Sequence, residues 1–146
     1  MTKAQTHGVL SLGLFGICVI LGAAAMFAQT WLLGVTYLSS CVLAVFSIVY
    51  GFCAKCACQD ECGHVLPGKL ARLFRREPSP YSALEIATLL LACLILFGVP
   101  QLWLWKQPTL FVIFWIMAIS AGIDIRRCVC TACSNRFCPA HCGKSA

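Results

Sequence analysis

Four long apolar stretches constrain the fold of this chain more than any other feature of its sequence. They cover approximately residues 9–28, 31–50, 83–105 and 109–125. A helix needs about 20 mainly apolar residues to cross a bilayer, and each stretch reaches or approaches that length. The only charged residues within them are Glu85 and Asp124, each near a helix end. The sequence therefore predicts an all-α integral membrane protein with four transmembrane helices.

The overall composition agrees with this prediction. Hydrophobic residues make up 60% of the chain and charged residues 11%, which leaves too little polar surface to cover a water-soluble domain of 146 residues. We therefore predict a single membrane domain over residues 1–146 of the chain. The first stretch is longer than the roughly 7–15-residue apolar core of a signal peptide, so we expect it to remain as a helix.

The lengths of the connections predict two helical hairpins. Very short turns join the first stretch to the second and the third to the fourth, so the members of each pair are expected to be antiparallel neighbours. A loop over residues 51–82 separates the hairpins, and a tail over residues 126–146 follows the second. Both segments are rich in cysteine, so a cysteine cluster follows each hairpin.

Several residues mark the expected ends and bends of the helices. Ser82 and Glu85 have the spacing of a capping box at the start of the third helix. Pro108 suits the first turn of the fourth helix. Pro100, with Gly98 nearby, is expected to bend the third helix close to its end.

The distribution of basic residues predicts the orientation of the chain in the membrane. Only Lys106 lies on the side of the short turns. Ten basic residues lie on the side of the N-terminus, the loop and the tail: Lys3, Lys55, Lys69, Arg72, Arg75, Arg76, Arg126, Arg127, Arg136 and Lys144. Because cytoplasmic segments carry the excess of Lys and Arg, we predict a multi-pass protein of the inner or plasma membrane with both termini in the cytoplasm. Trp31, Trp103 and Trp105 near the short turns fit the opposite interface.

A short amphipathic helix is expected within the loop. Apolar residues recur there at helical spacing, namely Leu66, Leu70, Leu73 and Phe74. Basic residues lie mostly between them, namely Lys69, Arg72, Arg75 and Arg76. Such a helix lies at a membrane interface, with its basic residues facing anionic lipid head groups. An acidic soluble partner for the basic face is the alternative. No nucleic-acid-binding motif accompanies the charge, so we expect no nucleic acid partner.

Nine of the twelve cysteines fall in the loop and the tail. The other three, Cys18, Cys41 and Cys93, lie within apolar stretches, where a single cysteine packs as a small apolar side chain. A reducing cytoplasm disfavours structural disulfides, so crowded thiols there favour metal binding. Lys55 and Arg136 are expected to offset the negative charge of thiolate ligands.

The spacing of these cysteines predicts a zinc site shared by the two clusters. Cys53 with Cys56, and Cys130 with Cys133, form two C-x2-C motifs, the common way to build a tetrahedral four-cysteine site. The remaining thiols and two nearby histidines suffice for a second site. The predicted ligands are Cys53, Cys56, Cys58, Cys62, Cys130, Cys133, Cys138, Cys142, His64 and His141. Cys128 is a further thiol of the tail, and His7 is expected to be an interfacial residue without a further role.

Three other interpretations of the cysteines remain open. An iron-sulfur cluster also takes four thiolates, and Cys138 followed by Pro139 resembles the last ligand of bacterial ferredoxins, although the rest of that series is missing. Palmitoylation would suit Cys53 or Cys128, close to the membrane. A thiol oxidoreductase would use a C-x2-C pair, but no βαβ pattern surrounds either pair.

One family resemblance rests on two segments, the loop pattern C-x2-C…C-G…PGKLARLF and the tail pattern C-x2-C-S-N-x2-CP. Together they resemble small prokaryotic four-helix membrane proteins with a cysteine cluster after each helical hairpin. The resemblance covers most of the chain. It implies the four-helix architecture and no particular activity.

No catalytic constellation is evident, so we expect no enzymatic activity from this chain on its own. The first hypothesis is an anchor, assembly or electron-transfer subunit whose metal-thiolate module binds a soluble or membrane partner. The second is the binding or transport of soft metal ions such as zinc, copper or mercury, which prefer sulfur. The third is a membrane thiol redox sensor or oxidoreductase. Small residues in the first stretch also permit close helix contact within a homo-oligomer.

Overall fold

The structure is a computed structural model that describes residues 2–56, 58, 62–74, 76–133, 135, 137 and 138. This part of the chain is helical and contains no strand. The four long helices are α1 (Lys3–Phe27), α2 (Trp31–Gly51), α4 (Ala83–Cys93) and α6 (Pro108–Asp124). The shorter elements are η1 (Cys53–Lys55), α3 (Val65–Ala71), η2 (Leu94–Gly98), α5 (Gln101–Leu104), η3 (Ile125–Val129) and η4 (Cys130–Ala132).

The predicted all-α architecture is confirmed, with four helices long and apolar enough to cross a membrane. They cover Lys3–Phe27, Trp31–Lys55, Ala83–Leu104 and Pro108–Val129. The first begins earlier than expected because Thr2 and Gln5 form a capping box ahead of the apolar stretch. The fourth is longer than expected because a π-helical turn, η3, continues it beyond Asp124.

The predicted start signals of the later helices are present. The Ser82 hydroxyl accepts a hydrogen bond from the backbone N–H of Glu85, and the Glu85 carboxylate accepts one from the backbone N–H of Ser82. This reciprocal pairing satisfies two amides that have no partner within the helix. Pro108 occupies the first turn of α6, where its missing N–H carries no penalty.

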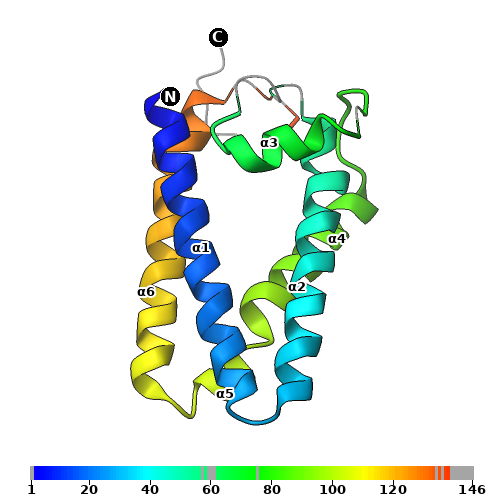
Figure 1. The fold of residues 1–146 in the computed structure, drawn as a ribbon. Helices are drawn as coiled ribbons and strands as arrows, with labels where there is room; N and C mark the ends of the chain where they lie inside the picture. The colour runs from blue at the N-terminus through cyan, green and yellow to red at the C-terminus, as the bar shows by residue number, and fades with distance from the viewer. Residues whose placement is uncertain are drawn as a thin grey trace.

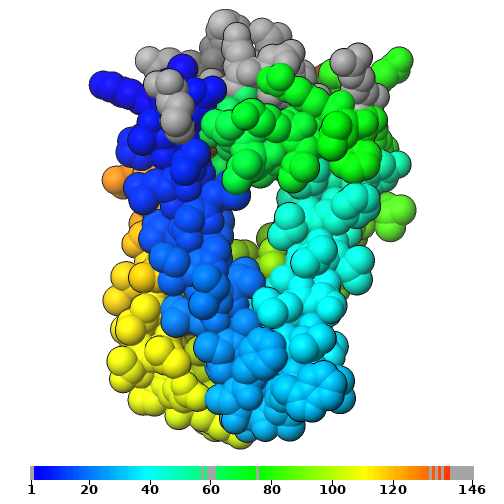
Figure 2. Space-filling view, in the orientation of Figure 1, coloured from blue at the N-terminus to red at the C-terminus, as the bar shows by residue number. Residues whose placement is uncertain are grey.

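Each helix of one hairpin packs along a helix of the other hairpin. α1 packs along α6, and α2 packs along α4. α1 and α2 meet near their connecting turn and diverge toward the opposite end, where α3 lies across them (Figure 1). The short connection predicts that the third and fourth helices pack against each other. In the structure, α5 and the neighbouring part of α6 make this contact. Figure 2 shows an opening between α1 and α2 below α3.

Two small apolar clusters hold these helices together. One joins α1, α2 and α4 with η2, and its buried members are Ala23, Met26, Tyr37, Cys41, Ala44, Ala92 and Leu96. The other joins α1 to α5 and α6, through Cys18, Ala25, Leu104 and Phe114. Cys18 and Cys41 are thus buried within the helix packing, as predicted for cysteines inside apolar stretches.

A π-helical turn interrupts the third long helix at η2, just before Pro100. This is the region where the sequence predicts a bend, and proline and π-turns are both recognised causes of helix irregularity. The Tyr37 hydroxyl donates a hydrogen bond of 3.0 Å to the Leu96 carbonyl in this turn. Gly22 lies beside Tyr37 and Pro100, since a methyl group there would come within 2.9 Å of the Tyr37 hydroxyl and 3.0 Å of the Pro100 ring. Tyr37 therefore ties α2 to η2 where α1 approaches closely.

Replacing Tyr37 with phenylalanine is expected to lower the free energy of unfolding by about 1–3 kcal/mol, because the Leu96 carbonyl loses its partner in a buried site. Tyr37 is 3% exposed. Unfolding of the detergent-solubilised protein, followed by tryptophan fluorescence, measures the change. Tyr50→Phe is the matched control, because the Tyr50 side chain is 47% exposed. Equal stability of the two variants would contradict a role for the hydroxyl of Tyr37.

Candidate metal centres

The two C-x2-C motifs adopt the same local conformation, each directly after a long helix. Cys53 begins the 3-10 turn η1, and the backbone N–H of Cys56 donates to the Cys53 carbonyl at 3.1 Å. Cys130 begins the 3-10 turn η4, and the N–H of Cys133 donates to the Cys130 carbonyl at 3.2 Å. Cys56 and Cys133 both leave these turns with extended backbone. Two equivalent turns therefore present two pairs of thiols.

The loop and the tail meet at the thiols of Cys56 and Cys133. A hydrogen bond from the Cys133 thiol lowers the pKa of Cys56, and the same contact raises the pKa of Cys133, the donor. Cys58 also interacts with both of these thiols. Two cysteine side chains within hydrogen-bonding distance are close enough for both sulfurs to bind one cation.

Further predicted ligands lie around this pair. Cys62 interacts electrostatically with Cys58 and Cys133, and burial raises the pKa of the Cys62 thiol. Cys53 interacts with Cys62 and with Cys138 of the tail. Hydrogen bonds and electrostatic interactions thus link six of the predicted cysteine ligands in one neighbourhood: Cys53, Cys56, Cys58, Cys62, Cys133 and Cys138. Cys130 lies one turn before Cys133 in η4.

Asn135 connects the tail to the loop and was not assigned a role from the sequence. Its side chain is buried, and its amide Nδ2 donates at 3.3 Å to both the Cys56 sulfur and the Tyr81 hydroxyl oxygen. The Tyr81 hydroxyl in turn donates to the Phe52 carbonyl at 3.2 Å, and the two rings stack. An N–H donor aimed at a sulfur is typical of the groups that orient a thiolate ligand.

His64 has the hydrogen-bonding pattern of a metal-ligating histidine. Its ring interacts with the backbone carbonyl of Gly8, and burial lowers its pKa, which favours the neutral ring. Within the part of the chain that the structure describes, the buried Nδ1 atom has no hydrogen-bond partner. A ligating histidine commonly donates its other N–H to a carbonyl and keeps one lone pair free. The thiols of the loop and the tail fit a cation bound by thiolates, and the His64 ring has one nitrogen available to a ligand.

A glycine contact places the His64 segment against α1. A methyl group on Gly8 would overlap the carbonyl of Gly63, and one on Gly63 would come within 2.6 Å of the Val129 side chain. The close approach of the Gly8 and Gly63 backbones therefore requires glycine at position 8, and glycine at position 63 leaves room for the Val129 side chain. The contact joins the loop to α1 and η3 at once.

Other predicted residues have different outcomes. Lys55, expected to offset thiolate charge, pairs with Glu85 at 2.9 Å, and Arg76 reaches the same carboxylate at 3.1 Å. His141, Cys142, Arg75, Arg136 and Lys144 lie outside the described residues.

The predicted amphipathic helix is present as α3 and the turn that follows. Leu66 and Leu73 are exposed at 62% and 77%, and Lys69 and Arg72 are also exposed. Phe74 packs edge-on against the rings of Phe46 and Tyr50. The segment is thus held to α2 by Phe74 and leaves apolar and basic side chains accessible.

A second group of ligand-type side chains lies between α1 and the end of α6. His7 Nδ1 is 2.7 Å from Asp124 Oδ1, and Ser11 Oγ donates to Asp124 Oδ2 at 2.7 Å. The Cys128 sulfur belongs to the same group, since the donor atoms of His7, Asp124 and Cys128 all lie within 4.8 Å of one another. The sequence does not reveal this group, because His7 and Asp124 are 117 residues apart.

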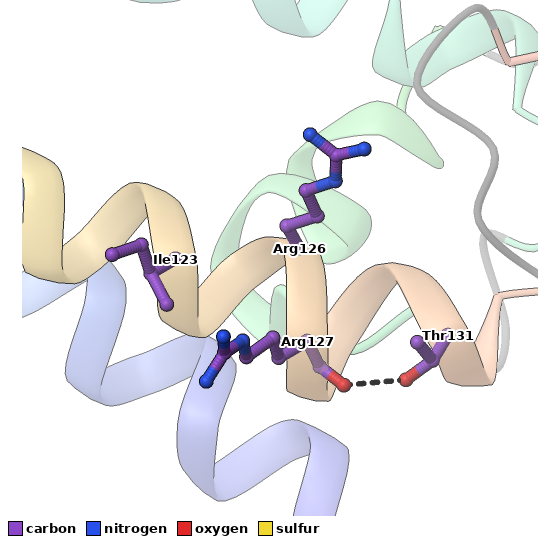
Figure 3. Close-up of a pocket in the computed structure, with 4 residues that line it drawn as sticks. All are labelled: Ile123, Arg126, Arg127 and Thr131. Atoms are coloured by element: carbon purple, nitrogen blue, oxygen red, sulfur yellow. Dashed lines mark hydrogen bonds between the residues drawn. The ribbon is translucent and has the colours of Figure 1, made fainter.

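Basic residues also surround an open pocket at the end of α6. Ile123, Arg126, Arg127 and Thr131 line it (Figure 3). The Thr131 hydroxyl donates to the Arg127 backbone carbonyl at 2.7 Å. The Arg127 guanidinium points away from Thr131 (Figure 3). Arg126 and Arg127 are both exposed.

Comparison with protein-family models, curated proteins and solved structures yields no match. The resemblance to small four-helix membrane proteins therefore stays a prediction, and the chemistry of the described residues has to carry the functional argument.

Proposed function

We propose that this chain is an integral membrane protein whose loop and tail form one metal-thiolate module on the cytoplasmic face. In this proposal it serves as an anchor, assembly or electron-transfer subunit for a soluble or membrane partner. The contact between Cys56 of the loop and Cys133 of the tail carries the proposal, because it joins the two C-x2-C motifs.

Membrane insertion is supported by the surfaces of all four long helices. Ile20, Val42, Leu90 and Ile116, one on each helix, are 60–68% exposed. Continuous apolar faces of this kind are unfavourable in water and favourable in lipid. Trp31 and Trp105 are exposed at the opposite end of the bundle from the cysteines, where indoles suit an interface.

The cytoplasmic placement of the termini and of the thiols follows from the basic residues at the cysteine-bearing end. In the same proposal, α3 lies in the head-group region and Lys69, Arg72 and Arg75 attract anionic lipid. Arg76 contributes less, because Glu85 already neutralises it.

Zinc is the cation that the donor set favours. Equivalent turns at Cys53–Cys56 and Cys130–Cys133 supply four thiols in two pairs, and Asn135 and Tyr81 give one sulfur its outer support. Bound zinc would hold the cysteines that follow both hairpins in one coordination sphere, and so connect the cytoplasmic ends of the hairpins. An iron-sulfur cluster on the same thiols is the alternative, and it would supply one-electron transfer.

A second candidate function is the handling of soft metal ions. Six thiols meet in this neighbourhood, which is more than one tetrahedral site uses. Surplus sulfur donors allow ligand exchange, so that zinc, copper(I) or mercury(II) can be captured and passed on.

Metal analysis of the anaerobically purified, full-length protein tests the proposal. We expect at least one zinc ion per chain and no visible colour, whereas a brown protein would identify an iron-sulfur cluster. Loss of metal to a chelator with uptake into vesicles would favour soft-metal handling. A metal-free protein whose cysteines form disulfides reversibly at mild potential would replace the proposal with thiol redox chemistry.

Thiol labelling in intact cells tests the topology. A membrane-impermeant maleimide is expected to leave Cys56 and Cys133 unmodified until the membrane is opened, because both face the cytoplasm. Labelling of these positions in intact cells would overturn the proposed orientation.

A further inference from the structure

We infer that His7, Asp124 and Cys128 form a second metal site, separate from the thiolate module and suited to Zn²⁺. It lies where α1 meets the end of α6 and η3. None of the three residues belongs to a C-x2-C motif or to the predicted ligand set. The site therefore does not depend on the proposed thiolate module.

The geometry supplies three donors of different chemistry at one point. An imidazole nitrogen, a carboxylate oxygen and a thiol sulfur lie within 4.8 Å of one another. Nitrogen, oxygen and sulfur together are the donor set that zinc takes, and three protein ligands with one open position is a common arrangement for it. Asp124 and Cys128 are one turn apart on the same helical segment, and His7 approaches from α1.

Ser11 acts as the positioning residue of this site. Its hydroxyl lies 2.7 Å from Asp124 Oδ2 and 2.8 Å from the His7 carbonyl, and its side chain is fully buried. A donor to the distal oxygen holds the carboxylate so that Oδ1 faces His7. Hydrogen bonds of this kind orient carboxylate ligands around metal ions.

Only a small movement is needed to admit a cation. His7 Nδ1 and Asp124 Oδ1 are 2.7 Å apart. In a tetrahedron with bonds of about 2.0 Å the corresponding edge is roughly 3.3 Å, so the two groups must separate by roughly half an ångström. The His7 side chain is 41% exposed, which leaves a route for the ion and a place for a water ligand.

The competing explanation is a purely hydrogen-bonded connection between α1 and α6. His7, Asp124 and Ser11 alone would satisfy it, since each already has a partner. Cys128 takes part in this connection as well, because its thiol donates a hydrogen bond to Asp124. The two explanations differ in the effect of replacing the imidazole with an amide. An amide can keep the hydrogen bond to Asp124, but it removes the nitrogen ligand of a metal site.

His7→Asn separates the two explanations in the full-length protein. Asparagine places an amide N–H near the position of imidazole Nδ1, so it keeps a hydrogen bond to Asp124 but removes the ligand. We expect this variant to fold with the stability of the wild type and to bind one zinc ion fewer per chain. Zn²⁺ stoichiometry, by competition with a chromophoric chelator, is the measurement.

Cobalt(II) provides the second measurement, because sulfur-to-cobalt absorption reports the thiolates bound. In the variant with Cys56→Ser and Cys133→Ser, we expect one remaining Co²⁺ per chain with the weak band of a single thiolate, lost on adding Cys128→Ser. Cys93→Ser is the control and should change neither number. Full zinc content in both His7→Asn and Cys128→Ser would overturn the inference and leave a hydrogen-bonded connection. If His7→Asn binds one ion fewer while the Cys56 and Cys133 changes leave the metal content unchanged, the result supports this site and contradicts the thiolate module.

Discussion

Replacing Cys133 with serine is expected to abolish metal binding by the thiolate module and to release the tail from the loop. The Cys133 thiol meets Cys56 directly, and Cys56 also accepts from Asn135, so Cys56 takes part in two of the contacts between the loop and the tail. Loss of an outer-shell partner alone typically costs roughly 10–100-fold in metal affinity, and loss of a ligand is expected to cost more. Cys56→Ser should have the same effect from the other side.

Zinc content after anaerobic purification measures the first effect, and limited proteolysis of the tail measures the second. Cys93→Ser is the matched control, because Cys93 lies within α4 rather than in either cluster. The two serine variants should be no worse in combination than alone, since both remove the same site. Independent, additive losses from the two changes would mean that the loop and the tail bind metal separately.

Gly8→Ala is expected to destabilise the protein by about 1–3 kcal/mol, the usual range for an overpacked contact. The added methyl group would overlap the Gly63 carbonyl and lie 3.2 Å from the backbone nitrogen of His64. Because these neighbours are backbone atoms, they cannot rotate away as a side chain would. The segment that carries His64 must therefore move off α1.

Gly13→Ala provides the contrast on the same helix. Among the described residues, no atom outside the neighbouring backbone of α1 lies within 4 Å of a methyl group at Gly13. Alanine there is expected to leave stability unchanged or raise it by up to about 1 kcal/mol, through helix propensity. Unfolding in detergent gives both values, and proteolysis within residues 62–74 reports whether the loop has left α1. A Gly8→Ala protein as stable as Gly13→Ala would show that the two backbones are not in tight contact.

Local sequence patterns were sufficient to predict the helices. The apolar stretches, the Ser82–Glu85 capping box and Pro108 each act within a few residues, and the structure contains all of them. The C-x2-C spacing likewise predicted two pairs of thiols, and both pairs form the same turn. Such features are set by short-range geometry, which one sequence records directly.

The partners across the bundle could not be predicted in the same way. Short connections indicated which helices follow one another, but side-chain shape decides that α6 packs along α1. The interaction of His7 with Asp124 depends on that packing, and so does the place of Asn135 beside Cys56. Glu85 was read as part of a helix cap, yet it also binds Lys55 and Arg76, which the sequence does not reveal.

The packing of each helix of the first hairpin along a helix of the second has a consequence for biosynthesis. α1 and α2 leave the ribosome first, but α6 and α4, along which they pack, are made later. At roughly 5–20 residues per second, about 4 to 15 seconds pass between the synthesis of Cys56 and that of Cys133. During this interval the nascent first half carries thiols whose counterparts do not yet exist. A chain terminated after α4 would hold them in that unfinished state permanently, as a target for quality-control proteases.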